Sequence, residues 1–402
     1  MELLELNKNN NNDILKQMKK YEYIVDYLKT TNYNFNYKPI ISKSLIKFFR
    51  LIYKQIKQSY LEVIKIKLNK KVINNNYKLK TNKFISKNIV NSINNTVKEY
   101  YNFSCKLNDL NVNINYAKLQ SDYNIEKIKN DIYNIIACLY LIKSFCKKSD
   151  FNNINIYLYK TKFSKHLPQN NVKILDCENV NSGYTLLGNS YRDLIIYREE
   201  EWFKVFIHEC FHAFKLDFNG ELSKEASDKI NKIIPIKNTI KIEEAYSETW
   251  AKILNCCIYS YTTTHNVKKF IKTCVLILKY EIYYSIIQMN KVLLYNNIIY
   301  DYINDNKTNK INLSTYIEKS NVFSYYVIST ILLFNYREFI KLTLENNETI
   351  CNFNKTTENI DNLVSFIERK ISKKRFIKII HLFQNHHIIF NNNALSMSLV
   401  EL

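Results

Sequence analysis

Apolar residues recur at helical spacing over most of the chain, with lysines and asparagines between them. Residues 45–66 and 125–146 are amphipathic stretches of this kind, and the sequence predicts helices there. Asparagine-rich patches near residues 9–12, 74–76 and 94–95 are expected to break the helices. We therefore predict a helical N-terminal region over residues 1–150, with no catalytic pattern in it.

From residue 151 to 198 the pattern changes to short β-branched and aromatic runs. Residues 155–161 predict a strand, and residues 172–175, 184–187 and 194–197 predict three shorter ones. Three glutamates at residues 199–201 follow the last strand and suit the positive end of a helix dipole. The last strand could hold an extended peptide by edge pairing, or could simply belong to the core sheet.

The next helix is expected from about residue 200 to 218, before the stop signal Asn219-Gly220. In its segment 205–214, seven of ten residues are apolar, and the polar ones are His208, Glu209 and His212. Histidines four residues apart lie on one helical face and can bind one metal ion, with the intervening glutamate as general base. The alternative is a chance match that forms a hydrogen-bonded histidine pair in the core. The apolar surroundings favour the metal site, because a buried carboxylate without a partner costs roughly several kcal/mol.

A third ligand is expected from a second helix over residues 242–254, which carries Glu244 and Glu248 on one face. A catalytic zinc takes three protein ligands and keeps one position open. We predict Glu244 as the ligand and Glu248 as an outer carboxylate that accepts the free ring N–H of a ligand histidine. The reverse assignment stays open, as does a solvated acidic face beside Lys241 and Lys252.

Residues 261–402 return to a helical pattern. Residues 267–294 and 360–383 predict helices, and residues 322–334 predict a buried one. The apolar run 320–336 is short for a membrane span and contains polar residues, so we expect a core helix and no transmembrane segment. The asparagine run 391–393 is expected to end the compact fold.

The two motifs resemble those of the gluzincin branch of zincin metallopeptidases, which pairs HExxH with a glutamate ligand on a downstream helix. Residues 208–212 match HExxH, and residues 244–248 resemble the second motif, with Glu248 where the family commonly has Asp. The block 194–254, roughly a sixth of the chain, also resembles uncharacterised peptidase-like proteins of large DNA viruses. The resemblance implies a mostly helical α+β fold, with a zincin-like core and its small mixed sheet over residues 151–260. Helical regions over 1–150 and 261–402 would flank this core.

The resemblance also implies a zinc peptidase acting on a peptide or protein substrate. Zn²⁺ would be held by His208, His212 and Glu244, and Glu209 would take a proton from water and pass it to the leaving amine. Other divalent metals fit the same ligands. The tetrahedral intermediate needs a hydrogen-bond donor from another segment. Candidates in the C-terminal third are Tyr336, Arg337, His381, His386 and His387.

Composition changes this interpretation little. The formal net charge is +21, but only six of the 58 basic residues are arginines and the lysines are spread along the chain. A lysine-biased solvated surface is favoured over attraction to nucleic acid or an anionic membrane. Nine cysteines without a regular framework and an acidic N-terminus without a secretory signal predict an intracellular, cytoplasmic protein, located in the host cytoplasm or virion if it is viral.

Two other hypotheses compete with the peptidase. The first is a catalytically inactive zincin-fold interaction protein, although a structural metal site has no use for the general base Glu209. The second is a basic nucleic-acid or membrane-surface protein in which HExxH is incidental. It requires lysines gathered on one face, which their even scatter along the sequence does not suggest.

Overall fold

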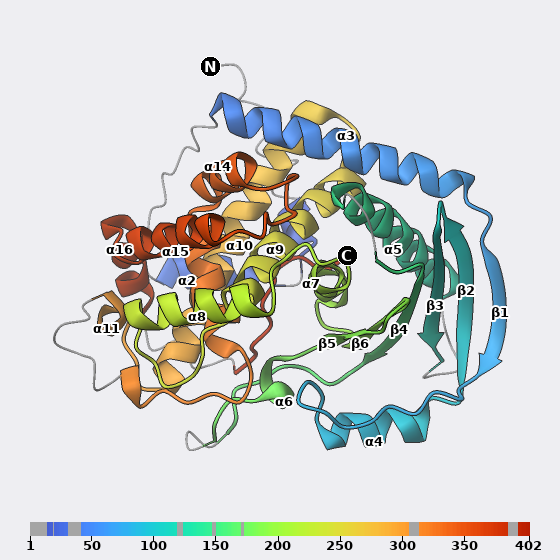
Figure 1. Cartoon of the computed structure of the whole chain (residues 1–402), viewed down its shortest axis with the longest axis horizontal. Coiled ribbons are helices and arrows are strands. Elements are labelled where there is room, and N and C mark those ends of the chain that lie inside the picture. Colours follow the sequence, from blue (N-terminus) through green and yellow to red (C-terminus); the bar gives the residue numbers. More distant parts are fainter. Residues whose placement is uncertain are drawn as a thin grey trace.

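One six-stranded mixed sheet and a larger set of helices make up the fold (Figure 1). The computed structural model describes residues 14–18, 20–30, 42–118, 124–146, 150–169, 173–304, 313–384 and 393–402. The predicted mostly helical α+β class is confirmed. Among the described helices, none combines the length and the apolar character needed to cross a bilayer.

The sheet has the strand order β1-β2-β3-β4-β6-β5. Its strands are β1 Asn69–Asn74, β2 Glu99–Leu107, β3 Leu110–Ala117, β4 Asn153–Thr161, β5 Gly183–Leu187 and β6 Tyr191–Arg198. β3, β4 and β6 are parallel, and the other neighbouring pairs are antiparallel. The strands predicted at 155–161, 184–187 and 194–197 are confirmed. Residues 173–175 form no strand, and residue 172 lies outside the described residues.

Strands β1, β2 and β3 correct the expectation that residues 1–150 are helical. β3 also pairs with β4 across the domain boundary predicted near residue 150. Its asparagines do not break the strand, because their side chains pair across the sheet. Asn115 accepts a hydrogen bond from Asn102 at 2.9 Å, and Asn113 donates to Asn155 at 3.2 Å. Of the asparagine patches predicted to break helices, Asn74 is instead the last residue of β1, and Asn94 and Asn95 lie in the last turn of α4.

The helices follow the predicted apolar periodicity closely. Their bounds are α2 Tyr21–Thr30, α3 Lys43–Lys65, α4 Lys87–Thr96, α5 Ile125–Phe145, α6 Cys177–Val180, α7 Trp202–Ala213, α8 Glu221–Ile233, α9 Ile242–Thr263, α10 Val267–Tyr295, α11 Asp301–Asn304, the π-helix η1 Phe323–Ile328, α13 Ser329–Phe334, α14 Tyr336–Asn346, α15 Thr357–Ile371 and α16 Lys374–Gln384. Two expectations are corrected. α7 ends at Ala213 instead of continuing to residue 218, and the stretch 360–383 falls in two helices, α15 and α16.

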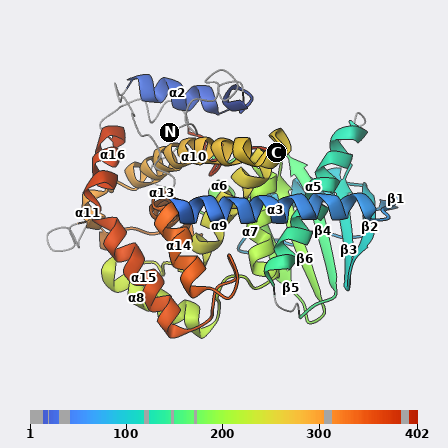
Figure 2. The same cartoon turned by 90° about the horizontal axis from the view of Figure 1, so that it is seen from above.

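The two faces of the sheet are covered differently. α5 and α7 join one face in the main core, whereas α4 packs on part of the other face in a smaller cluster with Tyr100, Tyr159 and Ile195. α7 lies between strands β5 and β6 and helix α9. The long helix α3 runs from the helical part of the molecule to the outer edge of the sheet (Figure 1, Figure 2). This arrangement places the helix with the two histidines between the sheet and the helical part.

The segment after residue 393 is another correction. The asparagine run 391–393 was expected to end the compact fold, and residues 391–392 lie outside the described part. Beyond them, Leu395, Met397, Leu399 and Val400 are buried. The last residues therefore belong to the core.

Candidate metal centre

Helix α7 carries both histidines, and its sequence explains its position. The helix is apolar on nearly all sides, as expected of a helix enclosed by other elements, and all of its residues except His212 are buried. It begins directly after β6, where Glu201 adopts a left-handed conformation with φ of 48°. The glutamates before it were expected to interact with the helix dipole. Glu201 instead accepts an ion pair from Lys165 and makes no side-chain cap to α7.

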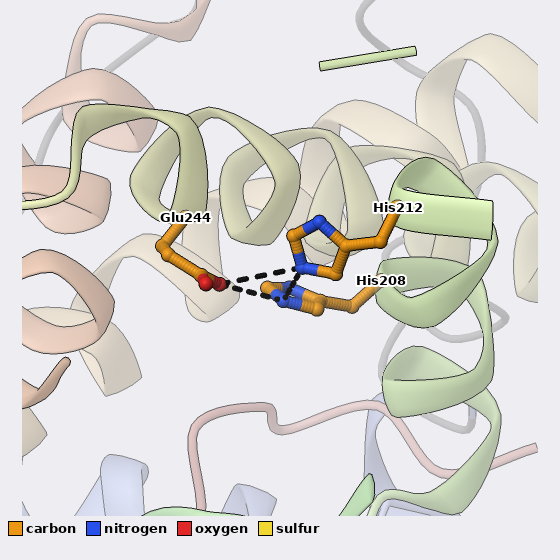
Figure 3. A group of neighbouring side chains, drawn as sticks. All are labelled: His208, His212 and Glu244. Atoms are coloured by element: carbon orange, nitrogen blue, oxygen red, sulfur yellow. Dashed lines mark hydrogen bonds and ion pairs between the residues drawn. The ribbon is translucent and has the colours of Figure 1, made fainter. Parts of the chain in front are cut away.

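The structure brings together the three residues predicted as metal ligands (Figure 3). The Nε2 atoms of His208 and His212 lie 3.0 Å apart, and each lies 3.3 Å from Oε2 of Glu244. Two atoms that bind one tetrahedral zinc at about 2.0 Å are themselves about 3.3 Å apart. The three side chains therefore have the separations that a single cation requires, and they could hold a metal ion.

Each histidine has a buried carboxylate beside its other ring nitrogen. Oε2 of Glu248 lies 3.1 Å from Nδ1 of His208, and Oδ2 of Asp217 lies 2.5 Å from Nδ1 of His212. Such partners fix the ring orientation and tautomer of a ligand histidine. Glu248 thus lies where an outer carboxylate was expected, on the side of His208 away from Glu244.

Asp217 was not predicted, because its position depends on how α7 ends. Lys215 adopts φ of 52°, and the N–H of Leu216 donates to the carbonyl of Phe211 at 2.9 Å. This is the hydrogen bond of a Schellman motif, which reverses the chain after a helix. The reversal returns Asp217 to His212. The signal available in the sequence was an Asp between the apolar residues Leu216 and Phe218.

A buried lysine, Lys204, binds both oxygens of the Glu248 carboxylate next to His208. Nζ of Lys204, one turn before His208 on α7, lies 2.9 and 3.1 Å from the two oxygens of Glu248. Nζ of Lys252 lies 3.7 Å from the same carboxylate. Burial alone would raise the pKa of Glu248, but Lys204 and the hydrogen bond to His208 hold it well below its usual value. Glu248 is therefore a charged, fixed partner for His208.

Glu209 is buried beside the histidines and does not belong to the ligand group. Its Oε2 accepts a hydrogen bond from the hydroxyl of Thr185 on β5 at 2.8 Å. Burial raises the pKa of Glu209. A cavity of about 30 Å³ is lined by His208, Glu209 and Tyr325, among others, and this volume is enough for a water molecule. A carboxylate in this setting can exchange a proton with a small molecule in the cavity.

Tyr325 is a second residue that the sequence did not single out. It lies on the π-helix η1, and its hydroxyl donates to Oε2 of Glu244 at 3.1 Å. The centroid of its ring is 5.8 Å from that of His208. Among 32 tyrosines it had no distinguishing spacing. An irregular helix at a polar site is a common feature of functional centres.

The predicted oxyanion donors lie elsewhere. Tyr336 and Arg337 line a different cavity of about 410 Å³, and Nε2 of His381 lies 2.8 Å from Asp301. None of these three lines the cavity beside Glu209. His386 and His387 lie outside the described residues.

The electrostatics of the site favour positive charge at the histidine nitrogens. Burial lowers the pKa of both rings, but hydrogen bonds to Glu244 and Glu248 raise the pKa of His208. Glu244 and Asp217 likewise raise the pKa of His212 well above its usual value. Protons and a divalent cation compete for the same lone pairs, so carboxylates that attract the proton also favour the cation.

No family model, curated protein or solved structure matches this chain.

Proposed function

We propose that the protein is a zinc-dependent metallopeptidase with a gluzincin-type centre. The convergence of two imidazole nitrogens and a carboxylate oxygen, within 3.3 Å of one another, supports this proposal most strongly. Beside them lies Glu209, a buried carboxylate in a position to act as general base. Nitrogen and oxygen ligands of this kind are those that catalytic zinc sites use.

The protein residues have separate roles in this proposal. His208, His212 and Glu244 would hold a divalent cation, which would supply polarisation of the scissile carbonyl and a lowered pKa of water. Glu209 accepts the proton of the attacking water and passes it to the nitrogen of the leaving amine. Its hydrogen bond from Thr185 keeps one oxygen fixed and leaves the other for proton transfer. Glu248 and Asp217 hold the ligand histidines in the required tautomers.

Tyr325 is the donor that we propose for the developing oxyanion. Its hydroxyl lies on the cavity side of the site, within hydrogen-bond distance of Glu244. A positioned hydroxyl at this point can donate to negative charge on the carbonyl oxygen as the water attacks. It replaces the C-terminal candidates suggested by the sequence.

The substrate is proposed to be an extended peptide that pairs with β5. The strand predicted for this role, β6, lies inside the sheet, whereas β5 is at its edge. β5 also carries Thr185, the partner of Glu209. Edge pairing would fix the backbone of a peptide next to the proposed base while leaving its side chains free to vary.

The test combines metal analysis with peptide hydrolysis. Purified wild-type protein is expected to hold about one zinc per chain and to cleave members of a peptide library. Glu209→Gln should retain the metal and lose about 100-fold or more in kcat. The matched control is Glu243→Gln, which changes a buried carboxylate bonded to Ser223 instead of the histidines.

Two results would reject the proposal. Metal-loaded wild-type protein that cleaves nothing would favour the inactive interaction protein. Protein that binds no metal would show that the three side chains only bond to one another.

A further inference from the structure

A basic stretch of the chain without any acidic residue lies at one end of the sheet. Residues 67–98 contain eight lysines and no aspartate or glutamate, and therefore carry +8 of the formal +21. All eight are exposed: Lys67, Lys70, Lys71, Lys78, Lys80, Lys83, Lys87 and Lys98. Lysines alone are spread evenly along the sequence, but acidic residues are missing here. We call residues 67–98 the basic segment.

The basic segment forms the outer edge strand of the sheet and a helix on one of its faces. It includes β1, the outer edge strand, and α4, which runs beneath the sheet together with the loop before it (Figure 1). In this loop, Tyr77 stacks on Tyr157 of β4 with ring centroids 4.6 Å apart. Nζ of Lys70 lies 5.3 Å from the ring centroid of Tyr101. The loop is thus attached to the sheet through Tyr77, and Lys70 lies on the sheet face opposite the one that Asn69 and Lys71 share.

The sheet face on the side of α4 has an unusual polar row. Residues at matching register positions on β1, β2, β3, β4 and β6 are Asn69, Ser104, Asn113, Asn155 and Asp193. The side chains of the last three are linked, because Asn113 donates to Asn155 at 3.2 Å and Asn155 to Asp193 at 2.8 Å. They point to one face of the sheet, since side chains at paired positions share a face.

A second polar row lies beside the first. Asn111 pairs in register with Asn153, which pairs with Tyr191. Asn111 and Tyr191 are exposed, and Asn153 is half-buried. The apolar cluster around α4 includes neither row. We call the two rows, with Lys71 next to them on β1, the polar sheet face.

We propose that the basic segment and the polar sheet face together bind single-stranded nucleic acid. Lysine side chains would contact the phosphates, as in any protein that tracks a nucleic-acid backbone. Asparagine amides offer both donors and acceptors, which base edges require. An exposed sheet face with Tyr191 on it and Lys71 beside it suits unpaired bases, which can stack and form hydrogen bonds there. This surface is separate from the metal centre and does not depend on peptidase activity.

Two observations favour a single strand over other polyanions. In the basic segment, Val72 is the exposed large apolar residue, whereas membrane-surface helices present several such side chains to the lipid. The polar rows lie across five strands of a sheet, and reading a duplex usually takes an element that enters a groove. An anionic membrane and a DNA duplex are therefore the alternatives to be tested.

The experiment measures fluorescence anisotropy of the full chain with labelled single strands of about 20 nucleotides. The test variant changes Lys71, Lys78, Lys80 and Lys83 to Gln. The control variant changes Lys224, Lys232, Lys237 and Lys374 to Gln, which removes the same charge from exposed positions on α8, in the segment after it and on α16. The test variant should bind about 10-fold or more weakly, with a salt slope smaller by about 3, because single strands lose about 0.7 per phosphate contact. The control should change by less than about 3-fold.

A second variant separates base contacts from charge. Asn111→Ala with Asn153→Ala should weaken binding to the single strand by about 5-fold or more while leaving the salt slope unchanged.

Equal losses in the test and control lysine variants would overturn the proposal, as would equal affinity for a duplex of the same length. Binding to phosphatidylserine vesicles without binding to oligonucleotides would overturn it in favour of a membrane surface. Glu209→Gln should bind the oligonucleotide like the wild type, so failure of the peptidase proposal leaves this one standing.

Discussion

Asp217 is the residue on which the orientation of His212 depends, because its carboxylate lies 2.5 Å from Nδ1. Asp217→Ala should weaken zinc affinity by about 10–100-fold, since the ring loses the partner that fixes its tautomer. Competition against a chromophoric chelator measures this change. Glu243→Ala is the control, because Glu243 is a buried carboxylate of α9 that bonds to Ser223. Zinc affinity that survives Asp217→Ala unchanged would exclude a role for Asp217 in the metal site.

Glu318 should make the stability of the protein depend on pH. Burial raises its pKa to about 7, although hydrogen bonds from Tyr316 and the Phe323 N–H oppose the rise. In the unfolded chain the pKa is 4.5. Because the folded value is higher, this contribution is complete below pH 4.5 and is lost as the pH rises towards 7. The loss should amount to about 3 kcal/mol.

Urea unfolding between about pH 5 and 8 tests this expectation. Glu318→Gln should abolish the part of the pH dependence due to this residue, whereas Glu221→Gln, at an exposed position on α8, should leave it unchanged. A wild-type profile that Glu318→Gln does not alter would show that the carboxyl is ionised throughout.

The residues of the candidate site were predictable to different degrees. His208, Glu209 and His212 follow from one short pattern, and Glu244 follows from helical spacing on a second helix. The structure brings the two histidines and Glu244 together. Three residues were missed because their roles depend on distant parts of the fold. Lys204 contacts a neighbouring helix, Asp217 depends on how α7 ends, and Tyr325 lies 81 residues from Glu244. No local sequence pattern contains that information.

At the scale of elements, the π-helix η1 positions the hydroxyl of Tyr325 at the site. Tyr325→Phe should retain zinc but lower kcat by about 100- to 1,000-fold, because a donor to the developing oxyanion is lost. The neighbouring residue provides the control. Tyr326→Phe removes a hydroxyl that donates to the carbonyl of Leu395 at 2.5 Å, and it should reduce stability by about 1 kcal/mol without this kcat effect.

Measuring kcat and zinc content for both variants makes the result decisive. If Tyr325→Phe retains kcat, the oxyanion donor must be sought elsewhere. If it loses zinc instead, the hydroxyl serves mainly to hold Glu244.

Helices whose buried residues recur at helical spacing were predicted well. Strands stabilised by side-chain pairs with a neighbouring strand were predicted poorly. The apolar spacing of α5, α9 and α10 gave helices at the right places. β2 and β3 were missed, although Leu110, Val112, Ile114 and Tyr116 alternate with asparagines along β3. The alternation was present in the sequence. The cross-strand amide pairs that make it stable become visible only in the folded sheet.

At the scale of the whole molecule, the segment from residue 394 to 400 connects distant parts of the fold. Glu201, at the start of α7, accepts the N–H groups of Met397 and Ser398 at 2.7 Å each. Glu281 of α10 accepts that of Leu399 at 2.8 Å. Burial opposes ionisation of Glu201, but Lys165 and Lys204 hold its pKa at about 2. The segment thus rests on a buried charged group that also includes the lysine behind the metal centre.

This segment should be essential for folding. Leu395, Met397, Leu399 and Val400 are buried, and burial of such a side chain contributes about 1.5–3 kcal/mol. Together they contribute about 6–12 kcal/mol, which is comparable to the whole stability of a typical domain, about 5–15 kcal/mol. Removing residues 394–402 should therefore abolish cooperative unfolding in urea, monitored by circular dichroism.

A single substitution keeps the test informative if the truncated chain cannot be purified. Met397→Ala should lower the free energy of unfolding by about 2–5 kcal/mol, because it leaves a cavity beside Lys204. Leu187→Ala, at a side chain that is 51% exposed on β5, is the control and should change stability by less than about 0.5 kcal/mol. A truncated chain with the wild-type urea midpoint would mean that the core is complete without the segment. In that case water would replace the hydrogen bonds that the segment donates to Glu201 and Glu281. The ion pairs of Lys165 and Lys204 would then be stable without residues 394–402.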